Sequence, residues 1–382
     1  MVSETVRGSV DDRLVESVDE VDDRLFAEWT ALADQVGSPY ASPAWCLGWM
    51  RQSGRQPVIC ICRTDGRLVG ALPLVRDGKT LRFPEQRAGD DFRPMIAPDE
   101  DHDAVLARIA ALLATTSRPW NTIAVREQRS DKEWVDAFAA ALPGAYSVVA
   151  RPSDERATIQ LSGGTTWDSY MAGLKRGVRK ETRRRRLEEA ADATTVCVEG
   201  GAELDEALRA LFGLHDSRWD ERGGSDVRSD ERTVTEQLVR DAASRGRLRL
   251  WIMTIDGKAA AGELAFVYES RQVHFMSGFD PQYANRGIGI VLMSYAIERA
   301  IEEEVSEIDL GPGASGYKRD YRTGLIDVRH TVVVPSRHPI RLALAAAYAG
   351  RTRLIHALSE ERTEWARDLK RRARSLRAGR NT

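Results

Sequence analysis

The segment HFMSGFDPQYANRGIGIVLMSYAIERAIEE, residues 274–303, predicts a strand that passes through a glycine-containing loop into a helix. The strand ends at Gly278, and apolar residues recur at helical spacing after the loop. Glycines at such a junction, here Gly287 and Gly289, let the backbone approach a ligand closely, so a phosphate can bind at the helix N-terminus. The same glycines also suit close packing of the helix on a sheet. Their spacing is neither the GxGxxG of a dinucleotide site nor the GxxxxGK(S/T) of a P-loop, so neither NAD nor ATP is supported.

The strands around this segment follow a pattern that occurs twice in the chain. RLRLWIMTI (247–255) and KAAAGELAFVY (258–268) flank one Asp-Gly pair, and PVICICRT (57–64) and RLVGALPLV (67–75) flank another. Asp-Gly between two apolar runs is a strong hairpin signal. Because the two hairpins lie half the chain apart, they suggest one α/β unit used twice, although Asp-Gly hairpins are common.

The remaining pattern divides the chain into four parts. In the first half, helices are expected at about 102–115 and 131–142, on either side of a strand at 121–127. Pro152 and Ser153 indicate a boundary. The predicted parts are an acidic N-terminal segment, a first α/β domain, a second α/β domain with the glycine loop, and a basic C-terminal helical tail: 1–24, 25–155, 156–336 and 337–382.

Composition limits the class of protein. A chain of 382 residues with 42% hydrophobic residues is long enough for two ordinary globular cores. The formal net charge of −2 gives no sign of a polyanionic partner for the molecule as a whole. The four cysteines have no CxxC spacing, which indicates reduced, structural thiols. Because the acidic N-terminus has no apolar core and no apolar run could cross a bilayer, we expect a cytoplasmic protein without a transmembrane segment.

Residues 284–289, ANRGIG, resemble the Q/R-x-x-G-x-G/A pyrophosphate loop of the GNAT acyltransferases, with Ala284 in place of the polar first residue. Further segments, in the right order over residues 25–335, resemble the double-GNAT CelD/BcsL-like family associated with cellulose biosynthesis, which is related to the Fem-type aminoacyltransferases. These segments are SPAWCLGWM (42–50), DGRLVGALPLV (65–75), LKRGVRKETRRRRLEEA (174–190), LHDSRWDERG (214–223), GFDPQYANRGIGIVLMSYAIERAI (278–301) and IDLGPGASGYKRDY (308–321).

This resemblance implies an α/β fold of two tandem GNAT-like domains, each with a mixed, mostly antiparallel sheet flanked by helices. The first domain would be degenerate, and the second would bind acetyl-CoA or another acyl-CoA as co-substrate, with no metal. The residues expected to bind the pyrophosphate of this co-substrate are those of the loop: Asn285, Arg286, Gly287, Ile288 and Gly289.

Acyl transfer to an amine needs a base for the nucleophile, a donor to the oxyanion and an acid for the departing thiolate. Glu263 and His274 lie on adjacent predicted strands and are candidates for the base, directly or through water. A strand histidine satisfied by its neighbours is an equally good interpretation of His274. Tyr317 follows the next strand, where GNAT enzymes often place a tyrosine acid. The candidates for a substrate pocket are His215, Trp219, Asp280 and Lys318.

The run KRGVRKETRRRR, residues 175–186, carries eight basic side chains and one glutamate. On a single helix, Tyr170, Leu174 and Val178 would form an apolar stripe, and basic residues such as Arg179 would point away from it. Such a face is either solvated and balanced by glutamates or in contact with an anion. The anions considered are coenzyme A phosphates, an acidic acceptor, a phospholipid surface and tRNA, and Arg179 is taken as a substrate-binding candidate.

These patterns predict an acyltransferase that moves an acetyl or longer acyl group from acyl-CoA to an amine, or to a hydroxyl, of a small-molecule, envelope or natural-product acceptor. Two alternatives keep the fold: a Fem-like transferase that uses aminoacyl-tRNA to form an amide or peptide bond, and a non-catalytic module in polysaccharide or envelope assembly. Metal chemistry and Ser-His-Asp hydrolysis have no supporting signature, since the six histidines are scattered and neither HExxH nor GxSxG occurs.

Overall fold

The computed structural model describes residues 9–86, 89–220, 229–268 and 270–337, together with positions 343 and 347. Nearly all of the predicted basic tail lies outside these residues. No helix in the described ranges is both long enough and apolar enough to cross a membrane.

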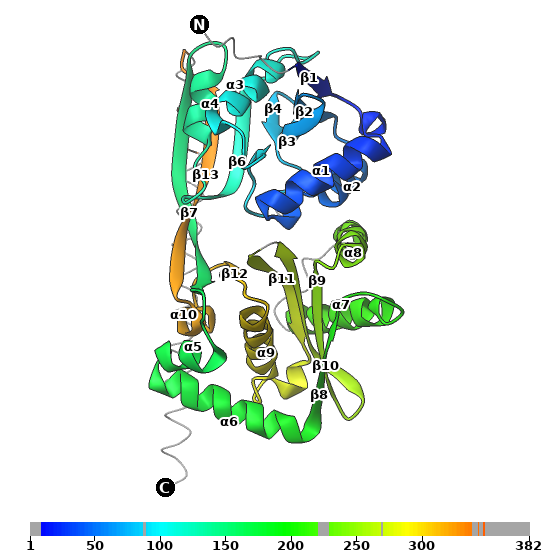
Figure 1. The fold of residues 1–382 in the computed structure, drawn as a ribbon, viewed down its shortest axis with the longest axis vertical. Coiled ribbons are helices and arrows are strands. Elements are labelled where there is room, and N and C mark those ends of the chain that lie inside the picture. Colours follow the sequence, from blue (N-terminus) through cyan, green and yellow to red (C-terminus); the bar gives the residue numbers. More distant parts are fainter. Residues whose placement is uncertain are drawn as a thin grey trace, which may run out of the picture.

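One mixed sheet runs through the whole described part of the molecule, in the order β1-β2-β3-β4-β6-β13-β7-β12-β11-β10-β9-β8, with β5 paired to β3 (Figure 1). The strands of the first half are β1 (Val10–Val15), β2 (Pro57–Thr64), β3 (Arg67–Asp77), β4 (Thr80–Arg82), β5 (Met95–Ile96) and β6 (Thr122–Arg129). Those that follow are β7 (Tyr146–Gln160), β8 (Ala193–Val198), β9 (Leu248–Ile255), β10 (Lys258–Tyr268), β11 (Arg271–Phe279), β12 (Glu307–Pro312) and β13 (Gly324–Pro335). Most neighbours are antiparallel, and each half contains one parallel pair, β4 with β6 and β11 with β12.

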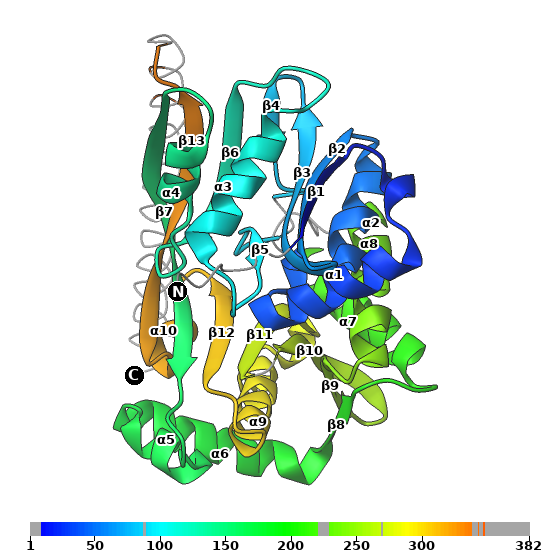
Figure 2. The ribbon, with the colours of Figure 1, turned by 45° about the horizontal axis from the view of Figure 1, so that its top comes forward.

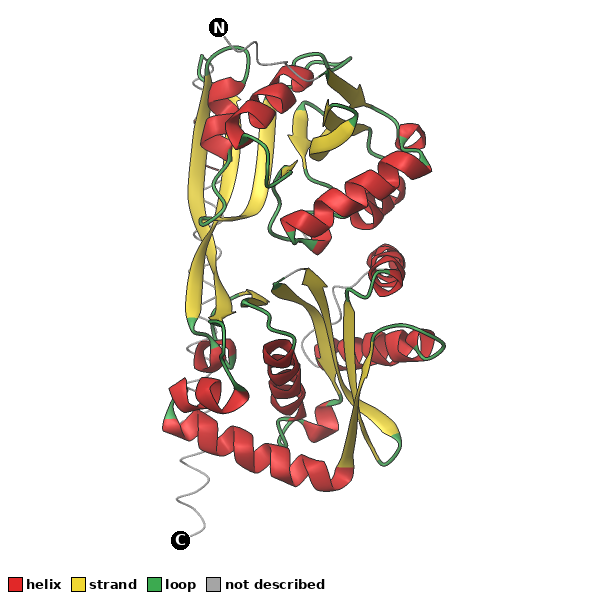
Figure 3. Ribbon diagram, viewed as in Figure 1, coloured by secondary structure: helices red, strands yellow, loops and turns green. Residues whose placement is uncertain are grey.

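Helices flank this sheet in both halves (Figures 2 and 3). The helices of the first half are α1 (Asp23–Val36), α2 (Pro43–Ser53), α3 (His102–Leu113) and α4 (Val135–Ala141), with the 3-10 turns η1 (Val18–Glu20) and η2 (Pro39–Ala41). Those of the second half are α5 (Trp167–Gly173), α6 (Arg176–Asp192), α7 (Leu204–Asp220), α8 (Ser229–Ser244), α9 (Ile288–Glu302) and α10 (Lys318–Tyr321), with η3 (Pro281–Tyr283). The predicted fold class, a mixed and mostly antiparallel sheet flanked by helices, is confirmed.

The two predicted Asp-Gly hairpins are present as β2–β3 and β9–β10. Asp65 and Gly66 have φ of 51° and 77°, and Asp256 and Gly257 have φ of 51° and 72°. Positive φ at both central residues defines the type I′ turn, whose twist matches that of the flanking strands. The same turn therefore shapes the corresponding hairpin in each half.

The two halves are joined by a pair of long strands rather than by a linker. β7 and β13 pair along their length from Tyr146 with Pro335 to Thr158 with Gly324, and they run side by side across both halves in Figure 1. Pro152 and Ser153, which suggested a boundary, lie inside β7. The acidic N-terminal segment also takes part in the fold, because β1 pairs with β2.

The basic segment forms two helices, where the sequence predicted one. α5 ends at Gly173, Leu174 is extended, and Lys175 is the N-cap of α6, which begins at Arg176. Tyr170 and Leu174 are buried, with Val178 partly buried against the same cluster, so the apolar stripe is still used.

Candidate active site at the start of helix α9

The predicted strand, loop and helix are present as β11, η3 and α9. The Asp280 carboxylate accepts a hydrogen bond of 3.0 Å from the backbone N–H of Gln282 and so fixes the turn after β11. Gly287 is the N-cap of α9 and has φ of 69°, a left-handed conformation that favours glycine. Ile288 is fully buried and anchors the start of α9 in the core. The loop is thus held at both ends, with Ala284 and Asn285 exposed between them.

Two cavities meet beside this loop. The first, which we call the strand cavity, has a volume of about 190 Å³ and is lined by Gly262 and Glu263 in the middle of β10, by the end of β11, by Ala284, by residues 287–290 and by Tyr317. The second, the helix cavity, has a volume of about 370 Å³ and lies between α6, Ile290 and the α10 residues Asp320 and Tyr321. Tyr317 and Ile290 line both cavities. The two cavities are therefore neighbours on either side of these two side chains.

Glu263 and His274 form a buried pair at the wall of the strand cavity. The Nδ1 atom of His274 lies 2.6 Å from Oε1 of Glu263, and its Nε2 atom lies 3.0 Å from the amide nitrogen of Gln272. With the Gln272 amide nitrogen as donor to Nε2, a neutral His274 carries its proton on Nδ1, facing the carboxylate. Glu263 lines the cavity, and His274 is not among its lining residues.

A β-bulge makes this pair possible. Glu263 is opposite Ser277, but the register between β10 and β11 shifts after Leu264, so that Ala265 is opposite His274. Side chains alternate across a strand, and one inserted residue therefore moves His274 onto the face that holds both Glu263 and Ser277. Strand alternation read from the sequence would have placed His274 and Ser277 on opposite faces.

Tyr317 and Lys318 come directly after the loop that follows β12. Tyr317 is the N-cap of α10 and is partly buried between the two cavities. The ammonium of Lys318 donates a hydrogen bond of 2.7 Å to the carbonyl of Pro312. Burial, with the nearby positive charge of Arg156, lowers the pKa of Lys318 to about 8. Lys318 lines neither cavity.

The charged residue of the predicted loop is already paired. Arg286 donates to the Glu189 carboxylate at 2.6 and 2.9 Å and lies 3.4 Å from Asp192, and its guanidinium is 5.6 Å from the Tyr283 ring. Asn285 is exposed and does not line either cavity. The predicted charge-assisted contact from Arg286 to a phosphate is therefore not preformed.

The basic helix α6 meets the loop through a different side chain. Arg179, the predicted substrate residue, donates to the carbonyl of Ala172 at 2.9 Å and caps the end of α5. Arg185 donates from Nη1 to the carbonyl of Arg286 at 3.1 Å and lines the helix cavity. Arg186 is paired with Glu298 and lies over the Tyr295 ring at 4.2 Å. Sequence reasoning missed Arg185, although its spacing of seven residues from Val178 puts both side chains on the same face of α6.

Of the other substrate candidates, His215 packs where α7 crosses β11. Its Nδ1 atom lies 3.1 Å from the carbonyl of Ser277. A Cβ on Gly278 would lie 2.4 Å from the backbone nitrogen of His215, so a glycine is needed where β11 and α7 approach each other this closely. Asp280 serves as the cap of η3. The side chain of Trp219 lies outside the described residues.

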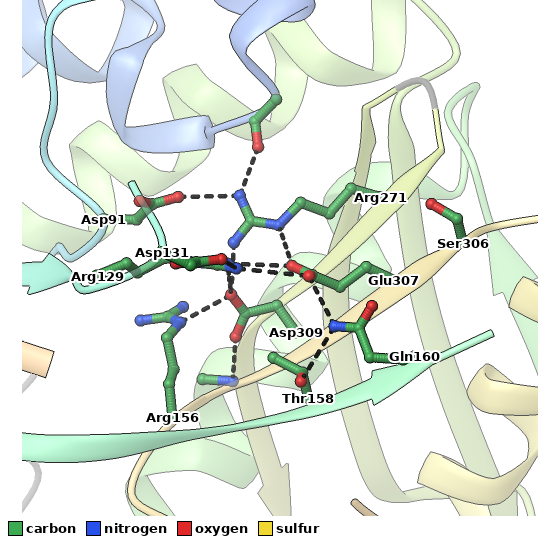
Figure 4. Close-up of polar contacts among 12 residues, drawn as sticks. Asp91, Arg129, Asp131, Arg156, Thr158, Gln160, Arg271, Ser306, Glu307 and Asp309 are labelled. Carbon is green, nitrogen blue, oxygen red and sulfur yellow. Dashed lines mark hydrogen bonds and ion pairs between the residues drawn. The ribbon is translucent and has the colours of Figure 1, made fainter. Parts of the chain in front are cut away.

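A cluster of buried charges lies where β12 meets β7 and the first half (Figure 4). Asp309 is fully buried, and its Oδ2 atom accepts from Arg129 at 3.0 Å, from Arg156 at 2.7 Å and from Arg271 at 2.5 Å. Its Oδ1 atom accepts from the Gly311 amide at 2.9 Å. The sequence signal for this cluster was a charged residue inside an apolar strand, as in EIDLG, but that pattern does not identify the partners.

Burial alone would raise the pKa of Asp309, but the charges of Arg156, Arg271 and Arg129 outweigh it and hold that pKa well below its usual range. The cluster links the two halves, since Arg129 is on β6 and Asp309 on β12. The β12–β7 register is interrupted between Asp309 and Pro312, just before the loop to Tyr317.

Comparison with known proteins places this site in a recognised kind of domain. Residues 176–319, somewhat more than a third of the chain, match the family described as the acetyltransferase (GNAT) domain. No curated protein matches the sequence. In the described residues, no group of three or more His, Cys, Asp or Glu side chains is arranged to hold a metal ion.

Several solved structures share the fold over most of the chain. FemX has a TM-score of 0.58 at 11% identity, covering 80% of this chain and 95% of its own. L-PGS from Bacillus licheniformis has a TM-score of 0.54 at 12% identity, covering 88% and 97%. A conserved protein from Bacteroides thetaiotaomicron has a TM-score of 0.53 at 12% identity, covering 84% and 99%. At these identities the likeness concerns the fold, and the narrower CelD/BcsL-like family stays a prediction.

Proposed function

We propose that the protein transfers an acyl group from an acyl-CoA to an amine held in the strand cavity. The observation that carries this proposal is the meeting of the two cavities at Tyr317, directly beside the glycine loop and with the Glu263 carboxylate in one wall. The helix cavity suits the extended arm of the donor, and the strand cavity suits the acyl group and the acceptor. The match of residues 176–319 to an acetyltransferase domain supports the same chemistry.

In this mechanism the buried pair acts as the base. Glu263 accepts the proton that the amine loses when its nitrogen attacks the thioester carbonyl, and His274 holds the carboxylate in place through Nδ1–H. The carbon–sulfur bond then breaks, and the hydroxyl of Tyr317 gives its proton to the departing thiolate. Because Tyr317 borders both cavities, its hydroxyl could reach a thioester positioned between them.

The decisive experiment measures donor binding and turnover separately. Calorimetric titration with acetyl-CoA and longer acyl-CoAs tests binding, and release of free thiol in the presence of a panel of amines tests turnover. Glu263→Gln should bind the donor like wild type and lose turnover by about a hundredfold or more, as removal of a general base does. Glu302→Gln, on an exposed residue of α9, is the matched control and should keep both.

Two other results would redirect the assignment. Binding of acyl-CoA with unchanged turnover in Glu263→Gln and Tyr317→Phe would refute these roles. Binding of a donor with no turnover by wild type would favour the non-catalytic module in polysaccharide or envelope assembly.

A second candidate is transfer from aminoacyl-tRNA, as in the Fem-type branch. It is favoured by the fold shared with FemX and by the eight basic residues between 175 and 186. Contacts to several phosphates release counterions, so binding of this kind weakens steeply as salt increases. Binding of deacylated tRNA with such a dependence, and no binding of acetyl-CoA, would establish this candidate in place of the first.

A further inference from the structure

The guanidinium of Arg185 lies directly on the glycine of the loop. A Cβ built on Gly287 would be 1.2 Å from Nη1 of Arg185 and 2.5 Å from its Cζ, so no other residue fits there with Arg185 in this position. The same nitrogen donates to the carbonyl of Arg286 at 3.1 Å, and Nε donates to Glu181 at 2.6 Å. The Nη1 end of the guanidinium therefore lies on the loop backbone, while Glu181 accepts a hydrogen bond from its Nε atom.

Neighbouring side chains do not supply this charge. Ala284 occupies the position at which the resembling loop has Gln or Arg. Arg286 is paired with Glu189 and Asp192. Arg184, one position before Arg185, is about half exposed and paired with Glu181 and Glu188. Arg185 is paired as well, with Glu181, but among these side chains it alone donates to the loop backbone before α9.

We infer that Arg185 is the cation that binds the pyrophosphate of the donor, in place of the side chain absent at Ala284. This inference rests on the proposed use of acyl-CoA. The Arg286 carbonyl is a neutral acceptor, and phosphate oxygens form stronger, charge-assisted bonds with a guanidinium. On donor binding, Nη1 therefore leaves the Arg286 carbonyl for a phosphate oxygen, and Glu181 keeps the side chain over the loop.

If Arg185 binds the pyrophosphate, only one residue of the basic run needs to contact a small ligand. Arg185 lines the helix cavity, which borders the strand cavity at Ile290 and Tyr317. A donor whose phosphates contact Arg185 could therefore place its thioester arm along Tyr317 toward Glu263. Arg185 determines specificity for donors that carry a pyrophosphate, and it takes no part in proton transfer.

The test compares Arg185→Met with Arg184→Met on two thioesters. Methionine keeps a long unbranched stem and removes the charge, so packing of α6 is least disturbed. The two donors are acetyl-CoA and S-acetylpantetheine, which has the same thioester arm without phosphates. We expect Arg185→Met to weaken acetyl-CoA binding about tenfold or more and to reduce its dependence on salt, since an ionic contact is lost. Affinity for S-acetylpantetheine should not change, and Arg184→Met should match wild type with both donors.

Each other outcome is decisive. Equal acetyl-CoA affinity in Arg185→Met and Arg184→Met overturns the inference and leaves the proposed function intact. Failure of wild type to bind either thioester removes the proposed function itself. Loss of tRNA binding in Arg185→Met with acetyl-CoA binding unchanged also overturns it, because the anion would then be a nucleic acid. If Arg185→Met changes the thermal midpoint, Arg185→Lys, which keeps the charge, must restore part of the acetyl-CoA affinity.

Discussion

Replacing Asp309 by asparagine tests whether the buried charge cluster holds the two halves together. The substituted side chain would have nearly the same shape but no charge, and three guanidiniums now share the Asp309 carboxylate. Two of them, Arg129 and Arg156, have side chains only 1% exposed, so water cannot take over the lost contact. The asparagine amide also presents an NH₂ group toward these donors when its oxygen accepts from Gly311.

The expected loss follows from this burial. Removing one partner of a buried ion pair costs about 3–5 kcal/mol, because the remaining charge is left uncompensated. The cluster keeps other carboxylates, such as Glu307 beside Arg129 and Asp90 beside Arg156, which places the expected loss near the lower value, about 3 kcal/mol. Asp131→Asn is the matched control: Asp131 pairs with the same Arg129 at 2.8 Å but is 40% exposed, and its loss should be no more than about 1 kcal/mol.

Urea unfolding at pH 7 measures this difference, followed by far-ultraviolet circular dichroism and by tryptophan fluorescence. The two signals should separate in Asp309→Asn, because the halves would no longer unfold together. The pKa of Asp309 is depressed in the folded protein, so its contribution is present at pH 7 and is lost as pH falls; the gap to wild type should narrow at acidic pH. A loss below about 0.5 kcal/mol, or one equal to that of Asp131→Asn, would refute the reasoning.

Three further predictions concern single residues. Burial and the nearby Asp90 and Asp154 raise the pKa of Glu127 to about 7. The folded protein therefore holds this proton more tightly than the unfolded chain, and its stability falls as pH rises from about 4.5 to 7. Between pH 5 and pH 8, the unfolding free energy of Glu127→Gln should rise relative to that of wild type by about 2–3 kcal/mol, as measured by urea titration. The pKa of Lys318 is lowered to about 8 in the folded protein, so the stability of wild type rises as pH increases above 8. The unfolding free energy of wild type should therefore rise relative to that of Lys318→Met by about 2–3 kcal/mol between pH 7.5 and 10.5. Gly278→Ala should destabilise by about 3 kcal/mol, since its Cβ meets the backbone of α7, and an unchanged thermal midpoint would contradict this packing.

The fold was largely predictable because its signals are local. The Asp-Gly turns, the apolar run of β10 and the change to helical spacing after Gly289 each depend on neighbouring residues, and these elements are present as predicted. The connection between the halves was not predictable in the same way. β7 contains Pro152 and several charged residues, which read as a linker, and its pairing with β13 brings together residues nearly two hundred positions apart.

The candidate site shows the same division. Glu263, Tyr317 and the glycine loop were named from the sequence, and the structure brings them to one cavity. The contact between Glu263 and His274 depends on a bulge of one residue, which no period in the sequence announces. The partners of Asp309 come from three other strands, so only the tertiary arrangement could identify them.

The basic run in α6 gives the most informative case, because its charge is mostly used within the protein. Arg183 lies near Asp168, Arg184 pairs with Glu181 and Glu188, and Arg186 pairs with Glu298. The hydrogen bonds from Arg184 and Arg185 lower the pKa of Glu181 to about 2, so its negative charge persists over the whole physiological range. A surface that binds a polyanion needs many unpaired cations along one face, whereas this helix balances most of its own charge and directs one guanidinium at Gly287. The arrangement therefore favours a small anion bound at one point over a nucleic acid bound along the helix.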